Sequence, residues 1–222
     1  MNDANLTFYE NLGIDPFKEL AIKGGFNSFV DLELAYPYLK ESNSILEIGA
    51  GYGRCIDFFL EKKFQGTLIG IEQSTPMVAH LEKKYKEEIK KDKVKIYKVD
   101  AKNLNLSQKV DAAIWMWSGI IDFSPEEQKK TISLISDHLT EKGALFIDIP
   151  RIGFRTYAEH KDLQNLHLDT PFGSLNCYIP DLKDIQKYSS VAGFNKITSL
   201  DYKTTTDKER TLYILHKYKC SH

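Results

Sequence analysis

The sequence predicts an α/β fold built on a mostly parallel sheet, and three observations support this class. Short apolar runs alternate with segments of helical period from residue 44 to residue 150, which is the pattern of strand–helix–strand crossovers. The run from Asp111 to Trp117 is apolar almost throughout, as a strand buried on both faces of a parallel sheet must be. The first run ends in a turn with three regularly spaced glycines, Gly49-Ala50-Gly51-Tyr52-Gly53.

Composition limits the classes of protein that this chain can represent. Its 222 residues, 42% of them hydrophobic and 12% aromatic, suit one domain with a large core. Thirty basic against 31 acidic residues give a net charge of −1, which does not favour a nucleic-acid-binding protein. The polar N-terminus lacks a signal core, and no apolar run is long enough to span a membrane.

The cysteines indicate the cellular compartment of the protein but no catalytic or metal-binding role. There are three of them, far apart in the sequence: Cys55, Cys177 and Cys220. Their spacing fits neither a disulfide framework nor a zinc site, so we expect no metal. A reducing, cytoplasmic environment is the expectation that follows.

Residues 1–43 precede the first strand and predict a helical cap. Pro16 can begin a short helix, Gly24-Gly25 breaks it, and an apolar-rich helix follows from Phe29 to Lys40. The many aromatic residues of this segment predict core packing. The alternative interpretation is that one or two of them close over a bound ligand.

Residues 44–150 form the core of the domain. The expected strands are Ser44–Ile48, Thr67–Glu72, Val94–Val99, Asp111–Trp117 and Gly143–Ile149. The expected helices lie between them, at about 52–63, from Thr75 past Ile89, and from Pro125 to about Thr140. The last of these helices begins with Ser124-Pro125-Glu126-Glu127, a capping box with proline at the first helical position.

Residues 151–180 interrupt the alternation with glycines, prolines and no helical period. An irregular segment of this length is uncommon in a compact domain and is often functional, so we interpret it as a substrate-side insertion. Residues 181–222 then predict a helix over Asp181–Ala192, stopped by Gly193. The strands Phe194–Lys203 and Arg210–Lys219 follow as an antiparallel hairpin at the sheet edge.

The glycine turn is a ligand seat, because glycine lets a ligand approach the backbone closely and a helix N-terminus follows. A dinucleotide-binding protein would show G-x-G-x-x-G, whereas the spacing here is G-x-G-x-G. Glu72, Asp100 and the turn Trp117-Ser118-Gly119 stand at the ends of three of the strands. Because ligands bind outside the carboxyl ends of the strands in such sheets, these residues are expected to converge on one crevice.

The stretch Glu47-Ile48-Gly49-Ala50-Gly51-Tyr52-Gly53 resembles the first motif of class I S-adenosylmethionine (SAM)-dependent methyltransferases. The similarity covers about residues 44–150 and continues in 182–188 and 192–194. It implies a three-layer, Rossmann-like sandwich around a seven-stranded sheet of order 3-2-1-4-5-7-6, with strand 7 antiparallel. It also implies that 44–150 is the SAM-binding core of a single domain and that SAM is the cofactor.

The resemblance assigns roles to the residues of the glycine turn. Gly49, Ala50 and Gly51 would let the methionine and ribose part of SAM approach the backbone, and Gly53 would begin the helix close to the strand. Glu47 would support the loop or the amino group of the cofactor.

The resemblance also assigns roles beyond the glycine turn. Glu72 would accept hydrogen bonds from the ribose hydroxyls, which a carboxylate can do for both at once, and Gln73 would flank the adenine. Asp100 would accept from the adenine amino group, with the Ala101 N–H toward a ring nitrogen. Trp117 would lie near the methionine end or the methyl group.

The sequence says less about the residues that would bind the methyl acceptor. Methyl transfer from a sulfonium needs mainly positioning, and a base only if the acceptor must lose a proton. His160, His167 and Tyr157 lie in the insertion and are the candidate catalytic residues. The turn after the fourth strand lacks the Pro-Pro-aromatic pattern of nucleic-acid-base and protein-amide methyltransferases, so we expect transfer to nitrogen or oxygen of a small molecule. The alternatives are an NAD-type oxidoreductase and a SAM-binding protein without transferase activity.

Overall fold

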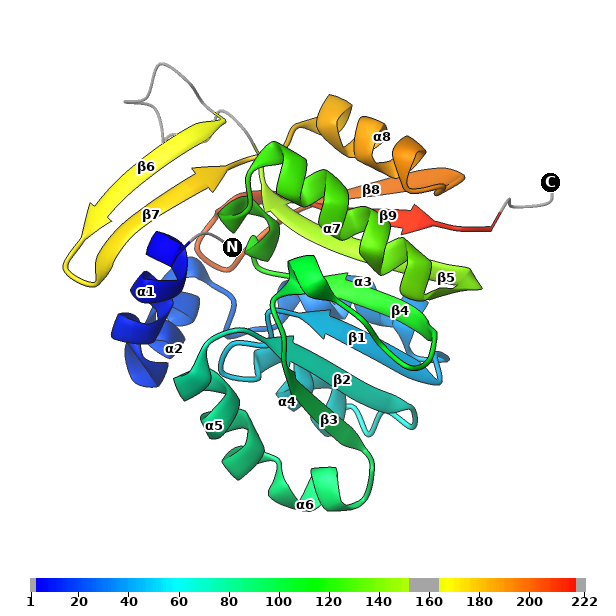
Figure 1. Ribbon diagram of the computed structural model, residues 1–222, viewed down its shortest axis with the longest axis horizontal. Coiled ribbons are helices and arrows are strands. Elements are labelled where there is room, and N and C mark those ends of the chain that lie inside the picture. Colours follow the sequence, from blue (N-terminus) through cyan, green and yellow to red (C-terminus); the bar gives the residue numbers. More distant parts are fainter. Residues whose placement is uncertain (1–2, 152–163, 219–222) are drawn as a thin grey trace.

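The computed structural model describes residues 3–151 and 164–218, and its centre is a seven-stranded sheet (Figure 1). The strand order is β3-β2-β1-β4-β5-β9-β8, which confirms the predicted α/β class and the expected order once the last two strands are renumbered. β9 is antiparallel to both β5 and β8, and the other pairs are parallel. The strands are β1 (Ser44–Ile48), β2 (Thr67–Glu72), β3 (Val94–Lys98), β4 (Val110–Trp115), β5 (Leu139–Pro150), β8 (Lys196–Lys203) and β9 (Glu209–His216).

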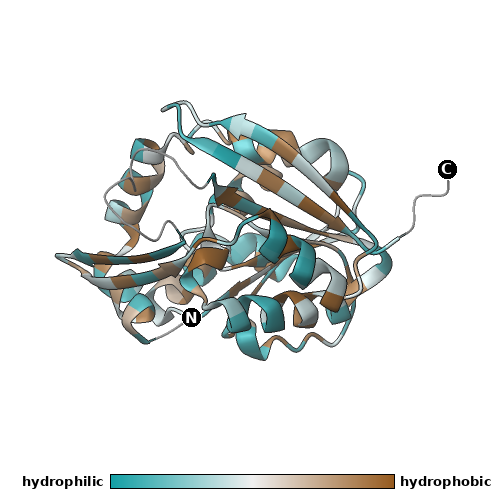
Figure 2. Ribbon diagram, turned by 90° about the horizontal axis from the view of Figure 1, so that it is seen from above, coloured by the Kyte–Doolittle hydropathy of each residue, from teal (hydrophilic) through white to brown (hydrophobic). Residues whose placement is uncertain are grey.

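Helices cover both faces of this sheet, so its central strands are buried on two sides. Ile45 packs with the helices of one face and Leu46 with those of the other, as alternation along a strand requires. Figure 2 shows hydrophobic colour along the central strands and hydrophilic colour on the outer helix surfaces. The helices are α1 (Asp3–Leu12), α2 (Ile14–Gly24), α3 (Val30–Leu39), α4 (Arg54–Glu61), α5 (Thr75–Lys84), α6 (Lys86–Lys90), α7 (Pro125–His138) and α8 (Leu182–Val191), with short 3₁₀ turns η1 (Ala101–Asn103) and η2 (Gly119–Asp122).

The turn between β1 and α4 has the conformation that its glycines predict. Gly49, Gly51 and Gly53 all have positive φ, at 71°, 55° and 90°, which other residues adopt only with strain. A side chain at Gly53 would also overlap the ring of Tyr85, whose hydroxyl donates to the Gly53 carbonyl at 2.7 Å. The predicted strand–glycine turn–helix unit is therefore confirmed.

Two segments differ from the sequence-based expectation. Residues 165–178 form a hairpin, β6 (Asn165–Thr170) and β7 (Gly173–Tyr178), in a two-stranded sheet of its own. The expectation of an irregular segment was wrong there, because a short period-2 pattern with one buried side is easily missed. Figure 1 shows the hairpin beside α1, itself a helix that the sequence analysis did not predict.

Trp117 is the second difference. The expected strand Asp111–Trp117 was too long at its end, because β4 ends at Trp115. Trp117 and Ser118 have left-handed conformations, with φ of 47° and 65°. The chain therefore turns sharply at this point, and the indole of Trp117 leaves the sheet.

None of the helices among the described residues is long and apolar enough to cross a membrane.

Candidate active site

A cavity of about 440 Å³ lies at the carboxyl ends of β1, β2 and β4. Its other walls are α1, α2 and the β6–β7 hairpin, which contribute Phe8, Phe17, Leu166 and Leu175. Ligand sites in proteins have this size and this largely apolar lining, and open α/β sheets bind ligands at this edge. The helical cap therefore closes over the crevice that the strand ends form.

The glycine turn forms one wall of the cavity and leaves room there. Gly49 and Gly51 both line the cavity. A Cβ atom built on Gly49 would meet no atom within 4 Å, whereas one built on Gly51 would lie 2.9 Å from Cε1 of Phe17. The space above Gly49 is thus an open cradle beside the backbone.

Glu72 lines the cavity at the end of β2 and is only 8% exposed. Its Oε2 accepts from the Gly51 N–H at 2.9 Å, and its Oε1 accepts from the Gln73 and Ser74 N–H groups at 2.8 Å. Burial raises the pKa of this carboxyl, and the three backbone donors partly oppose that shift. Glu72 therefore ties the glycine turn to the start of α5.

Glu47 lies beneath the turn, in a smaller cavity that shares Phe17, Gly49 and Trp117 with the large one. Its Oε2 is buried and accepts no hydrogen bond from the described residues. Burial raises the pKa of the carboxyl to about 8. An unpaired, buried acceptor is costly, so this atom suits a donor that arrives with a ligand.

The other residues expected to bind the cofactor differ in their positions. Gln73, Ala101 and Trp117 line the large cavity. Ala50 lines the smaller one, and Gly53 packs under Tyr85 outside both.

Asp100 does not line either cavity. Its carboxylate accepts from the Lys102 N–H at 3.0 Å and lies 3.6 Å from the Lys102 ammonium. In this arrangement Asp100 caps the 3₁₀ turn η1, which carries Ala101 to the cavity wall.

Aromatic side chains of the cap reach the strand ends. Phe17 stacks on Trp117, with ring centroids 4.9 Å apart and an interplanar angle of 22°. It also contacts Tyr9 and Tyr52, at centroid distances of 5.5 Å. The interpretation that cap aromatics close over a ligand fits this placement, because Phe17 lines both cavities.

The candidate catalytic residues of the insertion do not gather at the cavity. Tyr157 and His160 lie outside the described residues. His167 is exposed on β6, between Leu166 and Leu168, which line the cavity from the opposite face of that strand. Its Nδ1 lies 2.8 Å from Oδ1 of Asn176.

Asp122 and Tyr9 are the site residues that the sequence analysis missed. Both line the cavity, and the Tyr9 hydroxyl donates to Oδ2 of Asp122 at 2.8 Å. Burial raises the pKa of Asp122 to about 7 and that of Tyr9 well above its ordinary value. The two residues are 113 positions apart, and only the position of an acid after the fourth strand could have indicated Asp122.

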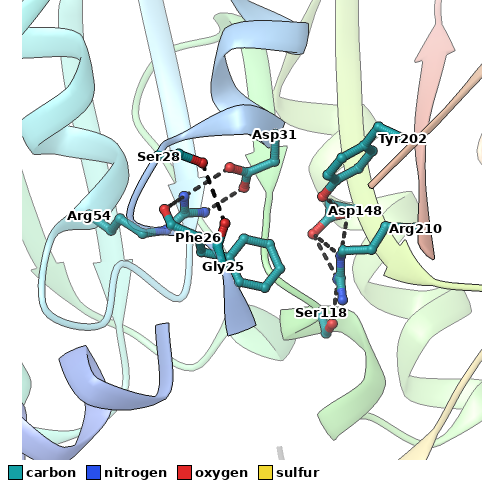
Figure 3. Close-up of polar contacts among 9 residues, drawn as sticks. All are labelled: Gly25, Phe26, Ser28, Asp31, Arg54, Ser118, Asp148, Tyr202 and Arg210. Atoms are coloured by element: carbon teal, nitrogen blue, oxygen red, sulfur yellow. Dashed lines mark hydrogen bonds and ion pairs between the residues drawn. The ribbon is translucent and has the colours of Figure 1, made fainter. Parts of the chain in front are cut away.

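Two buried ion pairs lie side by side, one joining the cap helix α3 to α4 and the other joining β5 to β9 (Figure 3). Asp31, on α3, accepts from both Arg54 nitrogens at 2.9 and 2.5 Å, and Asp148, on β5, accepts from Arg210 at 2.8 to 3.1 Å. The Phe26 ring lies between the two guanidinium groups, with centroid distances of 5.3 and 4.9 Å.

Arg210 also fixes the turn that follows β4. Its Nη2 donates to Oγ of Ser118 at 2.6 Å, and the Ser118 N–H donates to the Asp148 carbonyl at 3.0 Å. These bonds hold the left-handed turn that points Trp117 toward Phe17.

Comparison with known protein families finds one match to this chain. Residues 45–143 match the family model described as a methyltransferase domain. The match covers the glycine turn and the strands that form the floor of the cavity. No curated protein matches the chain.

Solved structures with the same fold are similar over most of their length. A SAM-dependent methyltransferase from Clostridium acetobutylicum is 16% identical, with a TM-score of 0.67, and the match covers 86% of this chain and 91% of that one. The glycopeptide N-methyltransferase MtfA in complex with S-adenosylhomocysteine (SAH) is 16% identical, with a TM-score of 0.67 and coverages of 83% and 87%. The magnesium protoporphyrin IX methyltransferase of Synechocystis, with bound SAH, is 16% identical, with a TM-score of 0.67 and coverages of 96% and 93%.

Residues 45–143 thus match a methyltransferase domain, and the chain has the class I, Rossmann-like fold of SAM-dependent methyltransferases. The domain match indicates an enzyme, and the similar structure of MtfA holds SAH, the product that SAM becomes when it loses its methyl group.

Proposed function

We propose that this enzyme transfers the methyl group of SAM to nitrogen or oxygen of a small molecule held in the 440 Å³ cavity. The observation that carries the proposal is the open cradle above Gly49, which joins the large cavity to the one containing Glu47. The cap and the β6–β7 hairpin enclose the opposite side, and this leaves space for a small acceptor. The NAD-type alternative is disfavoured by the glycine spacing and by the methyltransferase-domain match.

The residues present fit SAM in charge and in shape. The buried Oε2 of Glu47, which accepts nothing from the described residues, suits the amino group of the methionine part. Gly49 leaves the backbone accessible beside it. Glu72, Gln73 and Ala101 line the cavity further along the sheet edge, where we place the ribose and the adenine.

When bound, SAM supplies a methyl group already activated on a positively charged sulfur. The remaining work of the chain is to hold the two reactants in line and to exclude water. Phe17 and Trp117, stacked over the glycine turn, are placed to keep the reacting groups dry.

The test is a screen with SAM labelled in its methyl group. The purified protein is incubated with panels of uncharged small molecules, amines and carboxylates, and label transfer is measured by extraction. We expect transfer into small molecules and none into RNA, DNA or protein. Transfer into a macromolecule, with none into any small molecule, would contradict the proposed acceptor class while leaving the enzyme class in place.

A further inference from the structure

The acceptor side of the cavity has an unusual distribution of charge. Among the described residues that line the cavity, Glu72 and Asp122 are acidic and none is Lys, Arg or His. Glu72 is occupied by three backbone N–H donors. Asp122 forms no ion pair with any Lys, Arg or His of the described chain, although it is only 6% exposed.

Neighbouring side chains hold the Asp122 carboxylate in a fixed position. Tyr9 donates to Oδ2 at 2.8 Å, and the Asn5 amide donates to Oδ1 at 3.3 Å. Asn5 is itself clamped to β7, because it donates to the Asn176 carbonyl and accepts from the Asn176 N–H, both at 2.9 Å. The Cys177 thiol lies 3.9 Å from Oδ1.

These side-chain contacts supply hydrogen bonds but no positive charge, and the effect of the amino terminus offsets the burial only in part, since the pKa of Asp122 is still raised to about 7. A carboxylate taken out of water is strongly disfavoured unless a cation compensates it. A protonated amine entering the cavity would provide that cation. An anionic acceptor would instead place like charges together in an apolar site.

We propose that the acceptor is an amine, which binds as its ammonium ion against Asp122 and gives its proton to that carboxylate before it attacks. This inference rests on the proposed methyl transfer and specifies its acceptor. Tyr9 and Asn5 are positioning residues in this scheme, since they act on the acceptor through Asp122.

The proton and electron balance is complete without a further reactant. One N–H bond of the ammonium breaks, its proton moves to a carboxylate oxygen of Asp122, and the electron pair stays on nitrogen. That pair forms the new N–C bond while the S–C bond breaks and its electrons remain on sulfur. The charge lost by the sulfonium therefore appears on the methylated nitrogen.

The basicity of the carboxylate favours an amine over an alcohol. Burial raises the pKa of Asp122 to about 7, some three units below that of a simple amine, about 10.4. An alcohol is about as weak an acid as water, so its pKa lies too far above that of Asp122. A phenol is similar to an amine in pKa, but its proton transfer leaves a negative charge in the cavity, whereas ammonium and carboxylate become two neutral groups.

The test uses benzylamine, benzyl alcohol and benzoate as probes on protein saturated with SAH, with binding followed by calorimetry. We expect benzylamine to bind most tightly and benzoate least. Benzylamine affinity should rise by about tenfold per pH unit toward about pH 7 and then level off. Tyr9 and Cys177 face Asp122 but stay neutral in this range, since burial raises the pKa of Cys177 to about 12 and that of Tyr9 well above its ordinary value. The amino terminus also acts on Asp122 and, with an ordinary pKa of about 8, stays charged over this range.

Variants separate Asp122 from the other carboxyl of the cavity. In Asp122→Asn the pH-dependent rise in benzylamine affinity should disappear, and the affinity at neutral pH should fall about tenfold or more. This variant still contains Glu72, so the loss would be due to Asp122. Tyr9→Phe should move the rise to higher pH, because the carboxylate loses a hydrogen bond that stabilises its charged form. Asp169→Asn, on the exposed side of β6, is the matched control and should change nothing.

Three results would overturn the inference. Benzyl alcohol could bind as tightly as benzylamine, Asp122→Asn could bind benzylamine like the wild type, or Tyr9→Phe could leave the pH profile in place. If Asp122→Asn fails to bind SAH, the pH dependence of benzylamine affinity in Tyr9→Phe decides whether the inference holds. Failure of the wild-type protein to bind SAH would instead refute the proposed function itself.

Discussion

Glu47 and Glu72 are both buried carboxyl groups beside the glycine turn, but their surroundings differ. Glu72 accepts three backbone hydrogen bonds and so has a structural task in the chain itself. Glu47 keeps one buried oxygen without a partner among the described residues. The sequence motif predicted that both acids would lie near the turn. It could not distinguish a satisfied carboxylate from an unsatisfied one, because that depends on local backbone geometry.

The raised pKa of Glu47 makes the stability of the protein pH-dependent. With a folded-state pKa of about 8 against an ordinary value of 4.5, the contribution of the neutral carboxyl is complete below about pH 4.5 and is lost as the pH rises to about 8. Relative to Glu47→Gln, the wild-type protein should therefore lose at most about 1.4 kcal/mol of unfolding free energy per pH unit over this window.

Urea unfolding at several pH values on both sides of this window measures the effect. Glu82→Gln, at an exposed position of α5, is the control and should follow the wild-type profile. Parallel profiles for the wild type and Glu47→Gln would show that Glu47 is not buried in the neutral form.

At the scale of elements, the order of strands and helices could be predicted, whereas the cap contacts could not. Periodicity, capping residues and glycine stops indicated α2, α3, α7 and α8 to within a few residues. Helix α1 and the β6–β7 hairpin were missed because they are stabilised by each other and by long-range contacts such as that of Asn5 with Asn176. The Tyr9–Asp122 pair depends on that packing and was missed for the same reason.

The cap should depend on its buried Asp31–Arg54 ion pair for stability. Asp31→Asn leaves the Arg54 guanidinium buried without its counter-charge, and breaking a buried pair in this way costs about 3 to 5 kcal/mol. We expect this loss in the unfolding free energy. Glu87→Gln breaks the exposed Glu87–Lys90 pair, at 2.8 Å, and should cost less than about 1 kcal/mol. Equal costs for the two variants would contradict the anchoring role of Asp31.

At the scale of the whole molecule, the sheet topology brings distant segments to one edge. Strand ends from β1, β2 and β4 form the floor of the cavity, and α1, α2 and the hairpin form the opposite wall. The apolar core on both faces of the sheet holds this edge in place. The sequence predicted the floor, since its motifs are local, but the wall is assembled from segments more than 150 positions apart.

The central claim is that the glycine turn is the seat of SAM, and calorimetric titration of the pure protein with SAM tests it most directly. We expect SAM and SAH to bind and NADH not to bind. Gly49→Ala should abolish or strongly weaken SAM binding, because its Cβ would occupy the open cradle. Gly193→Ala has a similar positive φ and equally free surroundings away from the cavity, and it should bind SAM like the wild type. Absence of SAM binding, or unchanged binding by Gly49→Ala, would contradict the account.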